Sequence, residues 1–233
     1  WAAGPGPAGG IRLVQATYQE VVPHVGTVTL PFEPSPDRPL RIAPVDGAVW
    51  ISGLVDGEDP VIVRVDQETG EVTHQRARTG EVFAADTPGD VLLLDATRLT
   101  RVATHDLTTI RSGDPLPDGL GEVGHVWYDR GNTVVVGDGT AGGTVVWDVS
   151  GAQLRQSQLT EPVVAATATV DVDRVALATA DGDIEIIDLT NPGPGQLLDA
   201  RHDAPVRHVR LTGPRLEVAY ADGHTSTHIV PTN

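Results

Sequence analysis

Aspartates in predicted turns are the residues of this sequence whose types and spacing could do chemistry. Four of them follow short apolar segments at comparable positions along the chain, namely Asp46, Asp86, Asp129 and Asp171. If these turns lie on one face of the fold, their carboxylates form an acidic ring that suits a divalent cation or a basic partner. The alternative is that aspartate is favoured there because its side chain hydrogen-bonds to the backbone of a turn.

A second group of candidate binding residues lies in the segment 114–122, which is the longest predicted connection between structural repeats. This segment contains Asp114 and Asp118 among several prolines and glycines. Long loops on a rigid scaffold often carry the binding surface, so this segment is a candidate partner contact. The alternative is a link that proline and glycine merely stiffen.

Paired carboxylates also raise the question of hydrolysis. Glycoside hydrolysis needs two carboxyl groups roughly 5–10 Å apart in a pocket lined for sugar. Aromatic side chains, which commonly form the platforms of sugar sites, make up only 4% of the chain. A glycosidase-like or metal-dependent hydrolase at a central channel is therefore kept as an alternative, and we assign no catalytic residue and no cofactor.

Histidines are concentrated near the end of the chain, at His202, His208, His224 and His228. Because His224 and His228 are four residues apart on a predicted strand, they face the same side, and together with His208 they could bind zinc. That convergence is awkward, since His208 lies on a strand that another strand separates from theirs. We expect surface or core histidines and predict no metal site.

The strands that must position these residues recur along the chain with a period of about forty residues. Short strand-like segments end at intervals of 40 to 42 residues, at Asp66, Asp106, Asp148, Asp188 and His228. A period of 40–45 residues with several strands in each copy is typical of a β-propeller, in which each repeat forms one blade. Turns of the Asp-Gly type separate the predicted strands within each copy.

Five such sets of strands fit the chain, with inner strands expected at 41–45, 81–85, 124–128, 163–167 and 206–210. The last set ends at Asn233 directly after its third strand, so we expect residues 26–32 to supply the fourth strand and close the ring. The prediction is an all-β fold, a single β-propeller of five four-stranded blades closed by an N-terminal strand. A sixth blade built around residues 11–20 is the alternative.

Composition narrows the class of partner. The net charge is −16 and every basic residue is arginine, which argues against nucleic acid because phosphate neutralisation needs a basic face. The chain has no cysteine, which excludes disulfides and thiolate metal sites. No apolar run approaches the roughly 18 residues that a bilayer span requires.

The N-terminal residues predict an attachment to something larger. Residues 1–10 have the composition of a flexible tether, and residues 11–233 form the predicted propeller domain. The chain lacks methionine and begins at Trp1, which indicates a processed protein or a fragment. These features favour an extracytoplasmic domain of a membrane-anchored bacterial protein, or one attached to another domain, with a cytoplasmic location as the alternative.

Several segments resemble known propeller repeats. Residues 144–149 resemble the Trp-Asp ending of a WD40 repeat, residues 180–189 its second hairpin, and residues 202–209 its histidine-led entry into an inner strand. Residues 66–72 are similar to the turn of YVTN and quinoprotein-like repeats. Only one third strand carries the Trp-Asp pair, and no repeat has the complete His–Ser/Thr–Asp–Trp set, so the resemblance is to a divergent WD40-like or YVTN-like propeller.

What this resemblance implies is binding of proteins or small ligands. Together with the acidic turns, it predicts a non-enzymatic binding or sensor domain that recognises a protein partner through its face loops. The alternatives are the hydrolase described above and a structural module in an assembly.

Overall fold

The computed structural model describes residues 2–5, 11–15, 24–28, 30, 40–45, 47–53, 61–66, 68–77, 80–84, 90–95, 97–129, 132–169, 171–191 and 193–231. Every regular element in these ranges is a β-strand, and none of them contains a helix that could cross a membrane. The chain divides into two units, residues 1–116 and residues 117–233, and each is described by itself.

The N-terminal unit contains three antiparallel sheets. The first joins β1 (Ala2–Pro5), β2 (Ile11–Gln15) and β3 (His24–Val28). The second joins β4 (Arg41–Val45), β5 (Ala48–Gly53), β6 (Val61–Asp66) and β7 (Val72–Ala77). The third joins β8 (Glu81–Ala84), β9 (Asp90–Leu94), β10 (Arg98–Ala103) and β11 (Thr109–Pro115).

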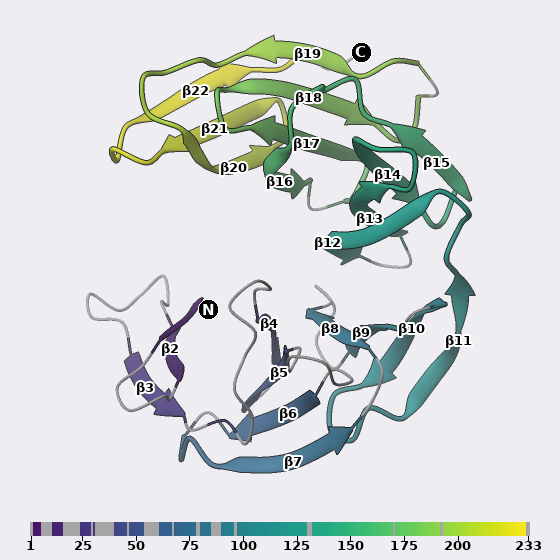
Figure 1. Ribbon diagram of the computed structural model, residues 1–233, viewed down its shortest axis with the longest axis vertical. Helices are drawn as coiled ribbons and strands as arrows, with labels where there is room; N and C mark the ends of the chain where they lie inside the picture. Colours follow the sequence, from purple (N-terminus) through teal and green to yellow (C-terminus); the bar gives the residue numbers. More distant parts are fainter. Residues whose placement is uncertain are drawn as a thin grey trace. The chain divides into compact units, whose positions relative to one another are not determined.

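The C-terminal unit also contains three antiparallel sheets, coloured from teal to yellow in Figure 1. The first joins β12 (Leu120–Asp129), β13 (Asn132–Gly139), β14 (Thr144–Asp148) and β15 (Gln153–Gln156). The second joins β16 (Val163–Ala168), β17 (Arg174–Thr179), β18 (Asp183–Asp188) and β19 (Gln196–Asp199). The third joins β20 (Val206–Thr212), β21 (Arg215–Tyr220) and β22 (Thr225–Ile229).

Each described sheet is a meander in which every strand pairs with the next one along the chain. This is the arrangement that the forty-residue repeat predicts, and the five expected inner strands appear as β4, β8, β12, β16 and β20. One predicted strand is displaced. The sequence placed a strand over 102–107, whereas β10 ends at Ala103 and Asp106 lies in the following turn, where its carboxylate accepts hydrogen bonds from Thr108. The aspartate marks the turn rather than the strand.

The N-terminal sheet uses residues that the sequence assigned elsewhere. Residues 26–28 of the segment expected to close the ring belong to β3, which pairs with β2. Residues 2–5, inside the expected tether, form β1 and pair with β2 as well. Across the described ranges there are six sheets, including one built on residues 11–15. The blade number and the closing contact stay predictions.

The core of the C-terminal unit lies between its stacked sheets. On β17, Val175 and Leu177 pack with residues of β13 and β14, while Ala176 and Ala178 pack with residues of β20 and β21. All four of these β17 side chains are fully buried. Because successive side chains of a strand point to opposite faces, this continuous apolar run places β17 between two neighbouring sheets. The packing makes these sheets a rigid support for the loops at their ends.

Candidate binding site on the loop face of the C-terminal unit

One end of the sheets in the C-terminal unit carries the loops that join one sheet to the next. In an antiparallel meander, the loop that enters a sheet and the turn between its second and third strands emerge at the same end. This end, called the loop face below, consists of residues 140–143, 157–162, 180–182, 200–205 and 221–224. Backbone hydrogen bonds join its parts, since Ala200 N–H donates to Gly182 and Val206 N–H donates to Ala180. The loop face is therefore held in place by the backbone as well as by side chains.

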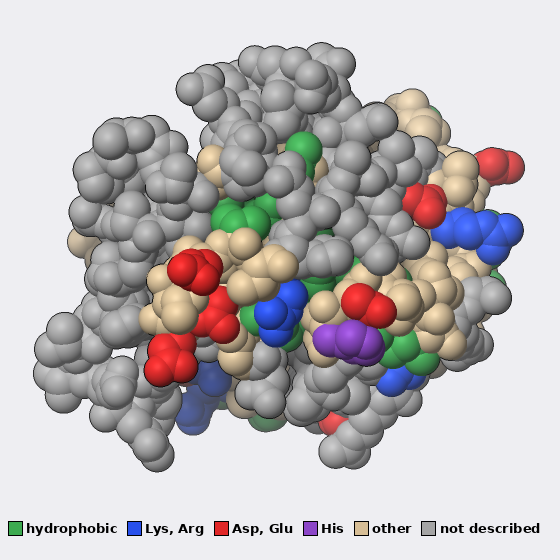
Figure 2. All heavy atoms as spheres, turned by 90° about the horizontal axis from the view of Figure 1, so that it is seen from below, with side chains coloured by type: hydrophobic (Ala, Val, Ile, Leu, Met, Phe, Trp, Pro, Cys, Tyr) green, Lys and Arg blue, Asp and Glu red, His purple; other side chains and the backbone are tan. Residues whose placement is uncertain are grey.

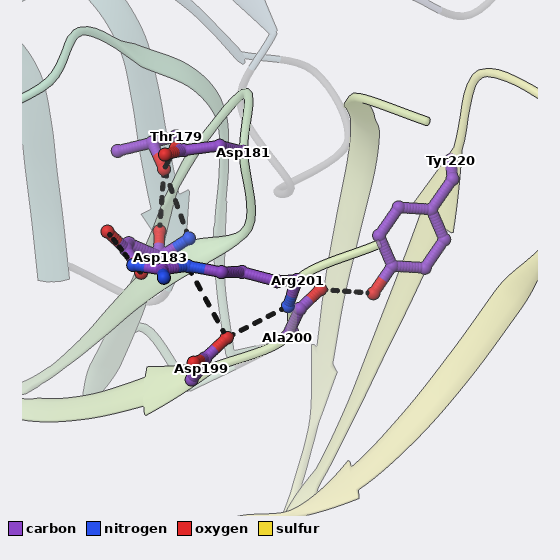
Figure 3. A network of polar contacts seen from close by, with 7 residues as sticks. All are labelled: Thr179, Asp181, Asp183, Asp199, Ala200, Arg201 and Tyr220. Atoms are coloured by element: carbon purple, nitrogen blue, oxygen red, sulfur yellow. Dashed lines mark hydrogen bonds and ion pairs between the residues drawn. The ribbon is translucent and has the colours of Figure 1, made fainter. Parts of the chain in front are cut away.

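Around the turn between β17 and β18, polar side chains form the network that Figure 3 shows. The Thr179 hydroxyl donates to a carboxylate oxygen of Asp181 over 2.7 Å, and this bond is the main reason that the pKa of Asp181 lies below its ordinary value. Arg201 donates to Asp183 over 3.1 Å and lies 3.8 Å from Asp199. Arg201 thus pairs with two carboxylates on neighbouring strands and fixes the loop that leaves β19.

A second polar group surrounds Tyr220 at the end of β21. The Tyr220 hydroxyl donates to the Ala200 carbonyl over 2.6 Å, as drawn in Figure 3, which ties the β19–β20 loop to β21. Nearby, His202 Nε2 lies 2.9 Å from an Asp222 carboxylate oxygen, and the His202 ring stacks on that of His224 with centroids 4.6 Å apart. The backbone N–H of His224 and then His202 lower the pKa of Asp222.

His202 and Asp222 are two members of the four-residue set that the resemblance to WD40 repeats implies, and the fold brings them together. The other two members are absent, because Tyr220 stands on the second strand and no tryptophan stands on β22. His228 contacts the Ser226 hydroxyl over 2.9 Å, and His208 is exposed on β20. No group of three or more histidine, aspartate or glutamate residues in the described ranges is arranged to hold a metal ion.

A buried glutamate anchors the 157–162 loop. Glu185 on β18 is 1% exposed and accepts hydrogen bonds from the Ser157 hydroxyl over 2.5 Å and from the Gln158 N–H over 2.8 Å. The Gln158 side-chain amide donates to the second Glu185 oxygen and to the Gly195 carbonyl. A carboxylate out of water needs such donors, so Glu185 specifies where the loop lies. Sequence reasoning missed it, and the signal was an acidic residue inside an apolar strand.

Two neighbouring cavities open on the loop face. The first, of about 330 Å³, has apolar residues in its lining, called its floor below, of which Leu197 is exposed and Ile184 is fully buried. The second, of about 380 Å³, lies beside the turn between β13 and β14, and both cavities share Thr160 and Glu161 as lining residues. Leu197 is 58% exposed, which is a large apolar side chain left in contact with water. Together these features make the loop face a candidate binding surface.

Of the acidic binding residues singled out from the sequence, Asp118 and Asp171 are described within the C-terminal unit, and neither lines these cavities. Asp46 and Asp86 are outside the described residues, and the side chain of Asp129, at the end of β12, is not described either. Asp171 is exposed in the turn between β16 and β17, at the opposite end of the sheet from the loop face. The acidic ring stays a prediction.

The segment 114–122 is shorter as a loop than the sequence indicated. Asp114 belongs to β11, where it lies opposite Leu99, and only residues 116–119 connect β11 to β12. Asp118 is exposed in that connection.

On the face that Figure 2 shows, acidic side chains and arginines lie among one another, so the charge there is mixed.

Comparisons with known proteins identify the fold. The sequence matches no protein-family model and no curated protein. The structure is similar to the Neurospora crassa Pan2 WD40 domain, at 11% identity and a TM-score of 0.60 over 96% of this chain and 70% of that one. It is also similar to the Dos1 propeller, at 14% identity and a TM-score of 0.61 over 95% of this chain and 62% of that one.

A third similar structure is the β-propeller domain of Myceliophteria thermophila Cps50 (Swd1), at 15% identity and a TM-score of 0.51 over 83% of this chain and 65% of that one. These likenesses confirm an all-β, WD40-like β-propeller fold. Because the identities are low, they concern the fold and leave the function to be argued from the site.

Proposed function

We propose that this protein is a non-enzymatic β-propeller domain that binds a protein partner through the loop face of residues 117–233. The observation that carries the proposal is the pair of adjoining cavities, whose apolar floor includes the exposed Leu197. Concave apolar surface with a few polar groups at fixed places is typical of binding sites. Buried Glu185 and the Arg201 ion pairs hold the surrounding loops, so the surface needs little ordering when a partner binds.

Protein binding also fits the fold class. WD40-like propellers present loops on a rigid stack of sheets, and loops on a rigid scaffold commonly carry binding residues. Fold alone is a weak argument for function, so the proposal depends on the loop face and its cavities.

The test uses a charge placed in the apolar floor. Leu197→Asp introduces a carboxylate into the first cavity without removing a buried side chain, so we expect it to fold and to lose the partner. Ile229→Asp is the matched control, because Ile229 is 68% exposed on β22 and lines neither cavity. Proteins captured by the wild-type chain from source-cell extract are purified, and their direct binding to the three chains is measured by calorimetry.

A partner that binds wild type and the Ile229 variant at least tenfold more tightly than the Leu197 variant supports the proposal. If the partner binds all three chains equally, or loses affinity only for the Ile229 variant, the interface lies elsewhere and the proposal is overturned.

A metal-dependent hydrolase makes a different prediction. Saturating Ca²⁺ or Zn²⁺ at a hundred times the Kd would stabilise such a protein by about 2.7 kcal/mol in a thermal melt, whereas we expect no shift.

A further inference from the structure

The chemistry of the two cavities indicates what kind of segment fills them. Resting on the proposed function, we infer that they take two basic side chains, two residues apart, from an extended segment of the partner. The argument depends on which carboxylates are free, on the apolar floor and on the spacing of side chains along an extended chain.

Among the acidic residues that line the two cavities, Glu161 and Asp138 have no hydrogen-bond or ion-pair partner in the described part of the chain. Three acidic residues line the first cavity, but Arg201 already pairs with Asp183 and Asp199. Glu161 is exposed, lines both cavities and has no hydrogen-bond or ion-pair partner among the described residues. Asp138, at the end of β13, lines the second cavity and is likewise unpaired within the described part of the chain. Each cavity therefore offers a carboxylate to a cation.

The floor of the first cavity suits the stem of a basic side chain. Arginine and lysine carry three or four methylenes that pack on apolar surface while the charged head stays near water or a counter-charge. Leu197, which is 58% exposed, provides such a surface, and Glu161 lines the same cavity. A purely apolar side chain would leave Glu161 partly desolvated without compensation, and an acidic one would be repelled.

The shared wall suggests an extended backbone. Because Thr160 and Glu161 line both cavities, the cavities adjoin, and one segment of the partner can place side chains in both. In an extended chain, side chains at i and i+2 lie on the same side about 6.6 Å apart. The net charge of −16 favours the approach of a basic segment and makes its association dependent on salt.

A degenerate library of nine-residue peptides, selected on the immobilised full chain, tests the inference. We expect enrichment of arginine or lysine at two positions separated by one residue. Measured by fluorescence anisotropy, the selected peptide should bind the double variant Glu161→Gln, Asp138→Asn about tenfold more weakly than wild type. Its binding to wild type should also weaken as the salt concentration rises from about 50 to about 500 mM, because salt screens the attraction between the charges. Both replaced side chains are exposed and unpaired, so the variant should fold normally.

Asp171→Asn is the matched control, because it removes one exposed carboxylate at the other end of the sheet and should leave the affinity unchanged. The inference is overturned if the selection yields acidic or purely apolar peptides or no peptide at all. It is also overturned if the selected peptide binds the double variant as tightly as wild type. The proposed function is still supported if Leu197→Asp abolishes binding of a protein partner. Both the inference and the proposed function are overturned if neither experiment detects binding that depends on the loop face.

Discussion

Two neighbouring sheets of the C-terminal unit differ in how their middle strands are buried. On β17, four successive side chains from Val175 to Ala178 are fully buried. On β21, Leu216 and Val218 are fully buried, while Arg215 before them and Glu217 between them are exposed. The β16–β19 sheet thus packs core residues on both faces, whereas the core contacts of β20–β22 within this unit lie on the face towards it, and Arg215 and Glu217 on the other face are exposed. The third strand, β22, pairs only with β21 among the described strands.

This difference separates two kinds of sheet within one repeat pattern. A strand covered on both faces is apolar throughout, and a strand with one open face alternates between apolar and polar residues. The β16–β19 sheet can therefore support the loop face rigidly, since its buried side chains pack against a neighbouring sheet on each face. Changes to the open face of β20–β22 should be tolerated.

The largest effect should come from the doubly covered strand. Leu177→Ala removes three side-chain carbons from a fully buried site and leaves a cavity, so we expect a loss of about 2–5 kcal/mol in the free energy of unfolding. Arg215→Ala on the open face should change stability by no more than about 0.5 kcal/mol. Urea titrations measure both, and similar losses for the two variants would contradict the contrast between the sheets.

A smaller effect should distinguish two glutamates. Glu185→Gln keeps the shape of the side chain but replaces one acceptor oxygen by a donor group and removes the charge that strengthens its hydrogen bonds, which should cost about 1–3 kcal/mol. Glu217→Gln makes the same change on the exposed face of β21 and should be nearly neutral. If the Glu185 variant is as stable as the Glu217 variant, Glu185 does not anchor the 157–162 loop.

The smallest effect should appear in acid. Asp181 and Asp222 stand in the equivalent turns of the two sheets, and hydrogen bonds lower the pKa of both below the ordinary value of 3.8. A lowered pKa in the folded state contributes stability above pH 3.8, and this contribution is lost as the pH falls through the folded-state pKa. We expect Asp222→Asn to flatten the dependence of the urea midpoint on pH below that value, and Asp181→Asn to do the same.

Because both aspartates are exposed, the change should be modest. Identical pH profiles for wild type and both variants would show that these hydrogen bonds are not maintained in solution.

Much of the strand order could be predicted from the sequence. Asp148 and Asp188 end β14 and β18 as the repeat indicated, because a strand followed by a turn leaves a local pattern of apolar residues and turn formers. Asp106 misled the same reasoning, since an aspartate in a turn and one at the end of a strand look alike. The WD40-like pairing of His202 with Asp222 was signalled by the histidine that precedes the inner strand.

The sequence by itself determined that this chain is an all-β repeat protein, because strand alternation, turn residues and the forty-residue period are local properties. Only the tertiary structure decided where the candidate binding surface lies. Glu185 meets Ser157 across 28 residues, and the cavities join Glu161 with Asp138 and Leu197 from separate strands and loops. Such contacts depend on how sheets stack, and no local pattern records which distant side chains the stacking brings together.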